Sequence, residues 1–200
     1  MNVHGCYFHF SQALWKRVQR VGLAGAYRRN PLVRRFVQKT MALGFLPLNI
    51  VRPQWDNLRN SPNTQALVAA NAGLQRFIHY FTRNWMNPNG VFRPQRWNVH
   101  NTRMEYRTNN AIEAYNRAWN WFVAARRPSL WVFLTKLKQR QAIHEVQINN
   151  MMIGVPPPRR KLKWRLLERH ITRETRRFRC GAIAVDLYWN RIMHLFQRFG

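Results

Sequence analysis

The chain has 200 residues, of which 46% are hydrophobic and 14% aromatic, and this composition favours a folded domain with a core over a disordered chain. Its 34 Lys and Arg against 7 Asp and Glu give a formal net charge of +27, so the expected partner is nucleic acid, with an anionic membrane surface as the less favoured alternative. Two cysteines exclude a secreted disulfide scaffold, and no apolar run reaches the roughly 20 residues that span a bilayer.

Three helices are predicted in the first half of the chain. Apolar residues at helical spacing over residues 10–21 predict an amphipathic helix that ends near Gly22. Asn30 before Pro31 predicts the start of a second helix, which Pro47 closes. The longest apolar stripe predicts one further helix, through Leu67, Ala70, Leu74, Phe77, Ile78, Phe81 and Trp85. Residues 87–101 are rich in Asn, Pro and Gly and predict a loop.

The second half continues with helices and no period-two strand pattern, so the sequence predicts an all-α, irregular array of roughly seven helices. One helix begins near Asn110, and another follows Pro128 with a predicted buried side formed by Leu130, Phe133, Leu134 and Leu137. After the stiff prolines 156–158, a basic helix places Leu162, Leu166, Ile171 and Phe178 on one side and Arg165, Arg169, Arg173 and Arg177 on another. A last amphipathic stretch carries Tyr188, Ile192, Leu195, Phe196 and Phe199.

Residues 107–116 read Arg-Thr-Asn-Asn-Ala-Ile-Glu-Ala-Tyr-Asn and lead directly into a helix. Their spacing alone favours a capping box, in which Asn110 is the N-cap and Glu113, three residues on, reaches back to the cap amide. The same stretch, Arg-Thr-Asn-Asn-x-x-Glu, resembles the segment that bears the last catalytic carboxylate of Mutator-like transposases. Residues 5–13, with Cys6-x-x-His9, are similar to the segment that follows the second catalytic aspartate of that family. Further blocks resemble the family in its order: residues 41–47, Tyr80-Phe81 with Trp85, Trp97-Asn98 and residues 128–137.

The resemblance implies the C-terminal part of a ribonuclease-H-like catalytic region, in which two strand-borne aspartates and a helix-borne glutamate hold two Mg²⁺ ions. Glu113 matches that glutamate, and the residues associated with the motifs are Cys6, His9, Thr108, Asn109 and Asn110. The implied divisions are a core remnant at 1–28, a helical insertion at 29–106, the glutamate-bearing helix and its successor at 107–150, and basic C-terminal helices at 151–200.

The two family aspartates are expected upstream of the Cys-x-x-His segment, because Asp56 and Asp186 do not stand at the family's positions. One carboxylate does not hold a pair of Mg²⁺ ions, so we expect no metal and no strand cleavage from this chain alone. The alternative is an enzyme completed by another chain that supplies the aspartates. Cys6 and His9 are only half of a zinc site, and a buried structural pair is the favoured interpretation. The sequence contains no evident nucleophile with a matching base and no glycine-rich phosphate loop. We therefore expect no small-molecule substrate.

Charge runs are usually solvated faces, but the scarcity of acidic residues near residues 159–165 favours nucleic acid as the partner. The same tract also fits a nuclear-import signal, so the expected location is the nucleus. The predicted contacts to DNA are Arg159, Arg160, Lys161, Lys163, Arg165, Arg169, Arg173, Arg176 and Arg177. Five tryptophans are candidates for stacking on bases, with a place in the core as the alternative: Trp97, Trp119, Trp121, Trp131 and Trp164.

These observations together predict a transposase fragment that binds DNA without sequence preference and does not cut it alone. The alternative is a transposon-derived interaction protein, which binds itself or a complete transposase through apolar surface that once packed on the catalytic core.

Overall fold

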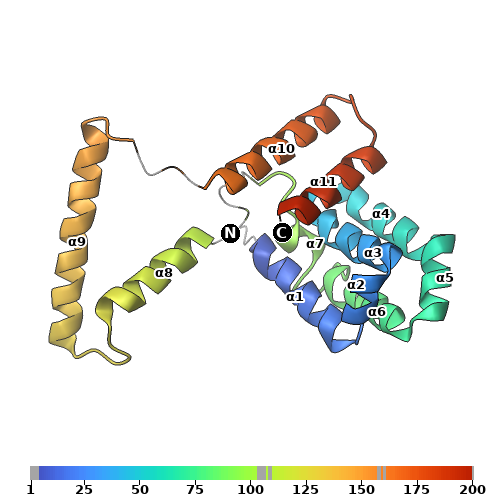
Figure 1. Ribbon diagram of the computed structural model, residues 1–200, viewed down its shortest axis with the longest axis horizontal. Coiled ribbons are helices and arrows are strands. Elements are labelled where there is room, and N and C mark those ends of the chain that lie inside the picture. The colour runs from blue at the N-terminus through green and yellow to red at the C-terminus, as the bar shows by residue number, and fades with distance from the viewer. Residues whose placement is uncertain (1–4, 103–106, 108–109, 157–158, 160, 200) are drawn as a thin grey trace. The chain divides into compact units, whose positions relative to one another are not determined.

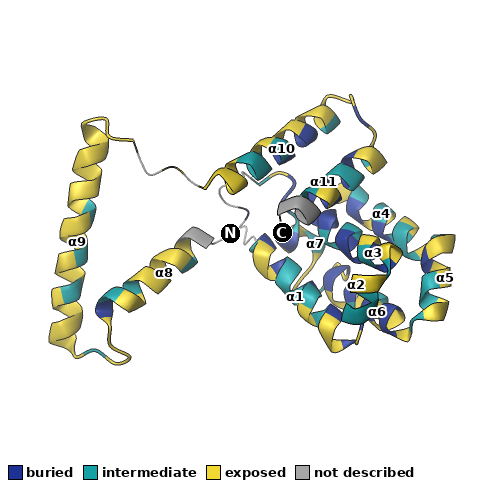
Figure 2. Ribbon diagram, in the orientation of Figure 1, coloured by how far each residue is buried: buried dark blue, intermediate teal, exposed yellow. Residues whose placement is uncertain are grey.

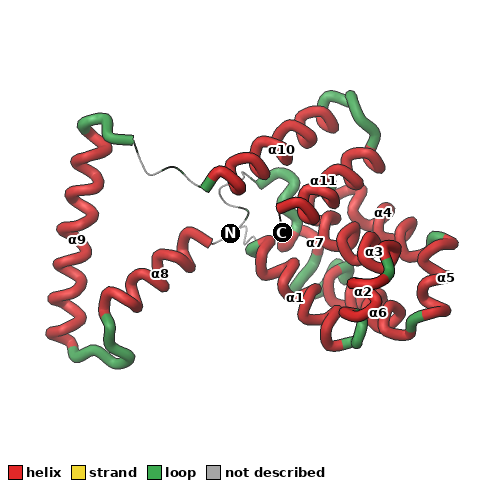
Figure 3. The backbone as a smooth tube through the Cα atoms, viewed as in Figure 1, coloured by secondary structure: helices red, strands yellow, loops and turns green. Residues whose placement is uncertain are grey.

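The computed structural model describes residues 5–102, 107, 110–156, 159 and 161–199, and every regular element in these ranges is a helix (Figures 1 and 3). The predicted all-α array is therefore confirmed. The described ranges hold eleven α-helices and one 3-10 helix, more than the seven expected from the sequence. The chain forms two compact units, residues 1–108 with 162–200, and residues 109–161.

The first unit is built from helices on both sides of the second unit in the sequence. Its elements are α1 (Tyr7–Arg20), α2 (Ala24–Arg29), α3 (Pro31–Ala42), η1 (Leu43–Phe45), α4 (Leu48–Asn60), α5 (Pro62–Ala70), α6 (Ala72–Trp85), α7 (Pro94–Trp97), α10 (Leu162–Arg179) and α11 (Val185–Phe199). The helix predicted over residues 10–21 is confirmed as α1. The predicted cap of α3 is confirmed as well, because Asn30 Oδ1 accepts a hydrogen bond from the amide of Leu32 at 2.9 Å.

The single helix predicted from Leu67 to Trp85 is wrong, because the chain breaks it into α5 and α6 at Asn71. Asn71 has an extended backbone, with φ −150° and ψ 98°, and its Oδ1 accepts a hydrogen bond from the amide of Gly73 at 3.0 Å. An asparagine that caps a new helix also ends the previous one, although the apolar spacing runs on through the break.

The core of the first unit is aromatic. The rings of Phe10 on α1 and Trp97 on α7 stack with centroids 4.6 Å apart and planes 2° from parallel. The indole Nε1 of Trp97 donates hydrogen bonds at 3.0 Å to the carbonyls of Trp85 and Phe92. Trp97 is therefore held by stacking on its ring face and by hydrogen bonds at its polar edge, as a buried indole requires.

The C-terminal helix α11 closes this core against the N-terminal half of the chain. Trp189 Nε1 donates to the carbonyl oxygen of Lys39 on α3 at 3.0 Å. Tyr188 Oη donates to the carbonyl oxygen of Phe45 at 3.1 Å, and both α11 side chains are buried. Residues far apart in the sequence thus form one core.

The second unit consists of α8 (Asn110–Val123) and α9 (Leu130–Met152), which pack against each other. Ser129 Oγ caps α9 by accepting from the amide of Val132 at 3.4 Å. The rings of Trp119 on α8 and Phe133 on α9 are nearly perpendicular, with centroids 5.9 Å apart. Val123 is the one buried residue among residues 112–156 (Figure 2).

The predicted buried side of α9 is wrong. Leu130 is 67% exposed and Leu137 46%, while Phe133 and Leu134 are each 37% exposed. The reason is that α9 packs only on α8 within its unit, and its apolar residues are spread around the helix and do not form one stripe. No helix in the described part of the chain is both long enough and apolar enough to span a membrane.

Candidate nucleic-acid interface

Helix α10 carries most of the predicted DNA contacts. Its apolar side packs into the protein, so the residues on its other sides face outward. Ile171 is 2% exposed and Thr175 7%, and the helix packs against α11 along this side. Thr175 Oγ1 lies 3.1 Å from Tyr188 Oη. Since the Tyr188 proton goes to the Phe45 carbonyl, Thr175 is the donor of this bond.

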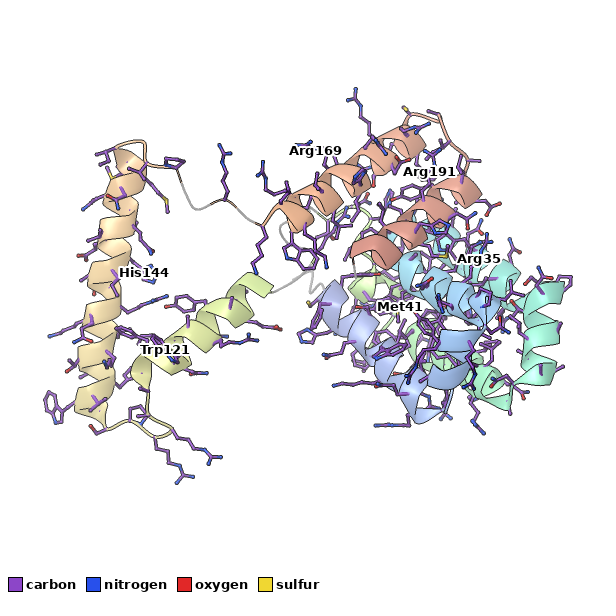
Figure 4. The ribbon with its side chains drawn as sticks, in the orientation of Figure 1. Arg35, Met41, Trp121, His144, Arg169 and Arg191 are labelled. Carbon is purple, nitrogen blue, oxygen red and sulfur yellow. The ribbon has the colours of Figure 1, made fainter. Side chains whose placement is uncertain are left out.

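Every lysine and arginine of α10 is exposed. This is expected of the polar residues of an amphipathic helix, which lie on the faces away from the core. These seven residues are Lys163, Arg165, Arg169, Arg173, Arg176, Arg177 and Arg179, of which Figure 4 labels Arg169. Arg159 and Lys161, just before the helix, are exposed too, and Arg160 lies outside the described residues. The sequence therefore placed the basic side chains of α10 correctly on the surface.

The acid Glu174 lies within this basic helix but is 3% exposed. Its Oε2 accepts from Arg191 Nη1 of α11 at 2.7 Å, and its Oε1 accepts from Arg173 Nε at 3.0 Å. Arg177 Nη1 lies 3.9 Å from Glu174 Oε2. Burial raises the pKa of Glu174, but the hydrogen bonds from Arg191 and Arg173 outweigh it and hold the pKa below its ordinary value. Glu174 therefore joins α10 to α11 as a carboxylate.

Glu113 lies in the first turn of α8 and is half-buried. The helix begins at Asn110 itself, one residue earlier than the predicted capping box requires, and Thr108 and Asn109 lie outside the described residues. The only other acid described in the second unit is Glu145, whose Oε1 accepts from Gln141 at 2.9 Å.

The Cys6 and His9 side chains lie in the first unit, at the start of α1. The prediction that they form a buried pair is wrong, since Cys6 is half-buried and His9 is exposed. Among the described residues, no three His, Cys, Asp or Glu side chains gather closely enough to hold a metal ion. Asp56 instead pairs with Arg59 on α4 at 2.8 Å, and Asp186 lies in the first turn of α11.

The five candidate tryptophans divide between core and surface. Trp97 is 2% exposed, so its predicted stacking on bases is wrong and the alternative, a place in the core, is confirmed. Trp119 is half-buried between α8 and α9, whereas Trp121 is 83% exposed and Trp131 78%. Trp164 on α10 is 44% exposed, with Lys163 Nζ 5.3 Å from its ring centroid. Figure 4 labels Trp121.

The first unit contains a pocket of about 490 Å³ that the sequence did not predict. Its lining residues are His100, Asn101, Thr102, Arg107, Thr172, Thr175, Arg176, Arg179 and Cys180. Helical spacing does group residues 172, 175, 176 and 179 on one face of α10, but no pattern in the sequence brings Arg107 and His100 to that face.

Within the first unit, the candidate interface therefore consists of the exposed basic residues of α10 with the half-exposed Trp164, next to a pocket rich in arginine. No protein family, curated protein or solved structure matches this chain.

Proposed function

We propose that this chain binds nucleic acid without sequence preference through the exposed basic face of α10, as a catalytically incomplete piece of a Mutator-like transposase. The observation that carries the proposal is that all seven lysines and arginines of this helix are exposed while Glu174, one of its two acids, is buried. The helix has 18 residues and so extends about 27 Å, enough to follow several successive phosphates of a duplex.

Arginine chemistry supports the choice of nucleic acid over a merely soluble surface. A planar guanidinium donates two parallel hydrogen bonds to a phosphate, and six of the seven basic residues of α10 are arginine. Trp164 and Lys163 add an exposed ring beside a cation at the start of the helix, a pairing that suits stacking on an unpaired base.

The transposase part of the proposal is supported by the ordered blocks that resemble the family, above all the Arg-Thr-Asn-Asn-x-x-Glu stretch before Glu113. In the family such a glutamate shares Mg²⁺ with two aspartates. Asp56 and Asp186 both lie on helices of the first unit, so neither matches a strand-borne aspartate. The chain is therefore proposed to need a further chain, or further residues, for strand cleavage.

The DNA-binding proposal is tested by fluorescence anisotropy with a labelled duplex of about 20 base pairs, titrated between about 50 and 200 mM salt. The affinity is expected to fall with a slope of log K against log salt near −0.9 for each neutralised phosphate. A dissociation constant that does not change with salt would overturn the proposal.

A matched pair of double variants tests the role of α10. R165Q/R169Q removes two charges from the α10 face, and R28Q/R29Q removes two exposed charges from α2. The α10 variant is expected to reduce the slope by about 1.8, which is two contacts of 0.9, and the α2 variant to leave it nearly unchanged. Equal losses in both variants would show that net charge, and not this face, binds DNA.

Catalytic incompleteness is tested with supercoiled plasmid and Mg²⁺. We expect no nicking by the wild-type chain or by Glu113→Gln, since one carboxylate does not hold two metal ions. Nicking by the wild type that Glu113→Gln abolishes would show a complete site and overturn this part of the proposal.

The second candidate is self-association through α9, which is favoured by the exposed apolar side chains of this helix. Leu130, Trp131 and Met152 at its two ends are 67%, 78% and 79% exposed, and none of the 23 residues of α9 is buried. Surfaces of this kind commonly mark protein interfaces. Light scattering after size exclusion tests it: a dimer that Trp131→Gln with Leu137→Gln converts to a monomer supports it, and a wild-type monomer contradicts it.

A further inference from the structure

The pocket of about 490 Å³ in the first unit is lined on one side by residues 100–102 with Arg107 and on the other by α10. Three of its lining residues are arginines, and three more, Asn101, Thr102 and Thr172, carry polar side chains that can donate hydrogen bonds. Its volume falls in the range of small-molecule sites, about 300 to 1,000 Å³. Its chemistry is that of an anion site.

Arg107 is the buried member of this set, at 8% exposed. Its Nε donates to the carbonyl oxygen of Thr102 at 3.0 Å, and its guanidinium lies 5.0 Å from the ring centroid of Phe45. Its Nη1 is buried and has no hydrogen-bond partner among the described residues. A buried donor on a cation is costly to leave unpaired, so Arg107 favours a ligand that accepts from it.

Arg179 and Arg176 add two cations at the α10 side of the pocket. Arg179 Nη2 donates to Asn101 Oδ1 at 3.1 Å and lies 3.5 Å from the carbonyl oxygen of His100, which holds its guanidinium at the rim. Arg176 precedes it by three residues and so lies on the same helical face. Both side chains are exposed and can reorient toward a ligand.

The charges around the pocket leave it positive. Burial, followed by the nearby charge of Arg179, lowers the pKa of Arg107 to about 10, so Arg107 is still a cation at neutral pH. Glu168, a half-buried residue of α10, is the acid whose charge favours the Arg107 cation. Three arginines against one carboxylate give a net charge of +2, which matches a dianion better than a singly charged group.

His100 offers a spectroscopic reporter inside the pocket. Its Nδ1 lies 2.7 Å from the carbonyl oxygen of Phe45, and because a carbonyl only accepts, Nδ1 carries the proton. Burial lowers the pKa of His100, and the charges of Arg179 and Arg107 lower it further against the effect of the Phe45 bond. A bound anion would offset these charges and raise that pKa.

We infer that this pocket binds the terminal phosphate of a phosphomonoester, with Arg107, Arg176 and Arg179 donating to its oxygens. A monoester is a dianion with three free oxygens, whereas a backbone phosphodiester has one charge and two free oxygens. The source is either a free mononucleotide or the 5′ end of a nucleic-acid strand. The pocket shares Arg176 and Arg179 with the proposed DNA-binding face, but Arg107 belongs to the pocket alone, and the DNA-binding face does not need a strand end.

Isothermal titration of the whole chain at about 200 mM salt tests this inference with five ligands: inorganic phosphate, adenosine monophosphate, adenosine, a trinucleotide with a 5′ phosphate, and the same trinucleotide without it. We expect inorganic phosphate and the monophosphate to saturate a single site, and adenosine and the unphosphorylated trinucleotide to bind at least about tenfold more weakly than their phosphorylated counterparts. If the phosphorylated trinucleotide binds more tightly than the mononucleotide, the source is a strand end; equal affinities identify the mononucleotide. No saturable binding of any phosphorylated ligand overturns the inference.

Two neighbouring residues of α10 provide matched variants. Arg176→Gln removes a pocket arginine, and Arg177→Gln removes an exposed arginine that does not line the pocket. The first is expected to weaken binding of the monophosphate about tenfold and the second by less than about twofold, since a charge-assisted hydrogen bond is lost only in the first. Equal weakening would show diffuse attraction and overturn the inference.

Two further readouts separate this site from the DNA-binding face. The monophosphate is expected to raise the pKa of His100 in an NMR titration of the wild type, and an unchanged His100 pKa in a saturated complex contradicts the inference. R165Q/R169Q is expected to leave monophosphate affinity within about twofold, because these residues do not line the pocket. Failure of DNA binding in that variant therefore leaves this site intact.

Discussion

Glu174 and Arg191 join the two C-terminal helices of the first unit, with Oε2 and Nη1 2.7 Å apart. Figure 4 labels Arg191 on α11. The carboxylate is 3% exposed and lies on the most basic helix of the chain, so it is surrounded by arginines and shielded from water. This ion pair fixes α10 against α11 and thereby orients the basic face toward solvent.

Replacing this carboxylate is expected to destabilise the first unit. Glu174→Gln keeps the side-chain shape but removes the charge that accepts from Arg191 and Arg173. We expect the free energy of unfolding to fall by about 2 to 3 kcal/mol, the cost of losing hydrogen bonds to a charged group. Urea unfolding followed by circular dichroism measures it. Arg177→Gln, whose contact to Glu174 is 3.9 Å, is the control and is expected to cost less than about 1 kcal/mol. Equal stability of Glu174→Gln and wild type would contradict this role.

The same carboxyl makes stability depend on pH in acid. Its pKa is lower in the folded protein than the ordinary value of 4.5, so the unfolded chain takes up the proton first as pH falls. The stabilisation is complete above the ordinary value and is lost as pH falls through the lower folded value. We expect the difference in unfolding free energy between wild type and Glu174→Gln to shrink from about pH 6 to pH 3. A difference that stays constant over this range would show that the charge is not involved.

Trp97 is expected to be among the most important core residues. It stacks on Phe10, donates two hydrogen bonds from Nε1 and is 2% exposed. Trp97→Ala removes the ring and leaves a cavity, so we expect a loss of about 3 to 5 kcal/mol in thermal or urea unfolding. Trp121→Ala is the matched control on an 83% exposed side chain and is expected to change stability by less than about 0.5 kcal/mol. Similar losses in both variants would contradict the assignment of Trp97 to the core.

Gly73 marks a close approach between α6 and the end of α1. A Cβ at this position would lie 2.9 Å from the carbonyl oxygen of Val21, a backbone atom that cannot turn aside. Gly73→Ala is therefore expected to cost about 1 to 3 kcal/mol. Gly25→Ala on α2 is the control, because the added Cβ meets only the flexible end of Arg29 and alanine favours the helix by about 0.5 to 1 kcal/mol. The melting temperatures of both variants give the comparison, and a stabilised Gly73→Ala would refute the close contact.

Local signals in the sequence predicted part of the fold well. Asn30 and Pro31 set the start of α3 because capping and the fixed φ of proline act within a few residues. The periodicity of α10 correctly separated its buried Ile171 from its exposed arginines. These features depend on neighbours along one helix, so a single sequence contains them.

The errors arose where the outcome depends on what the rest of the chain supplies. Leu130 and Leu137 are apolar at helical spacing, yet the described residues of the second unit form only α8 and α9, with no third helix to bury them. Asn71 broke a continuous apolar stripe, because a local cap competed with propagation of the helix. The pocket joins Arg107 to Arg179 across 72 residues, and no periodicity encodes such a distant pairing.

The hydrogen bond from Trp189 on α11 to α3 can form only late in synthesis of the chain. Its hydrogen-bond acceptor, Lys39, is translated 150 residues earlier, and the whole of the second unit is made in between. Until α11 emerges from the ribosome, the surface of α3 that α11 covers is exposed to solvent or bound by a chaperone. Nascent chains halted before residue 162 are therefore expected to be cleaved by protease at α3, and this sensitivity should disappear once residues 185–193 are free to dock.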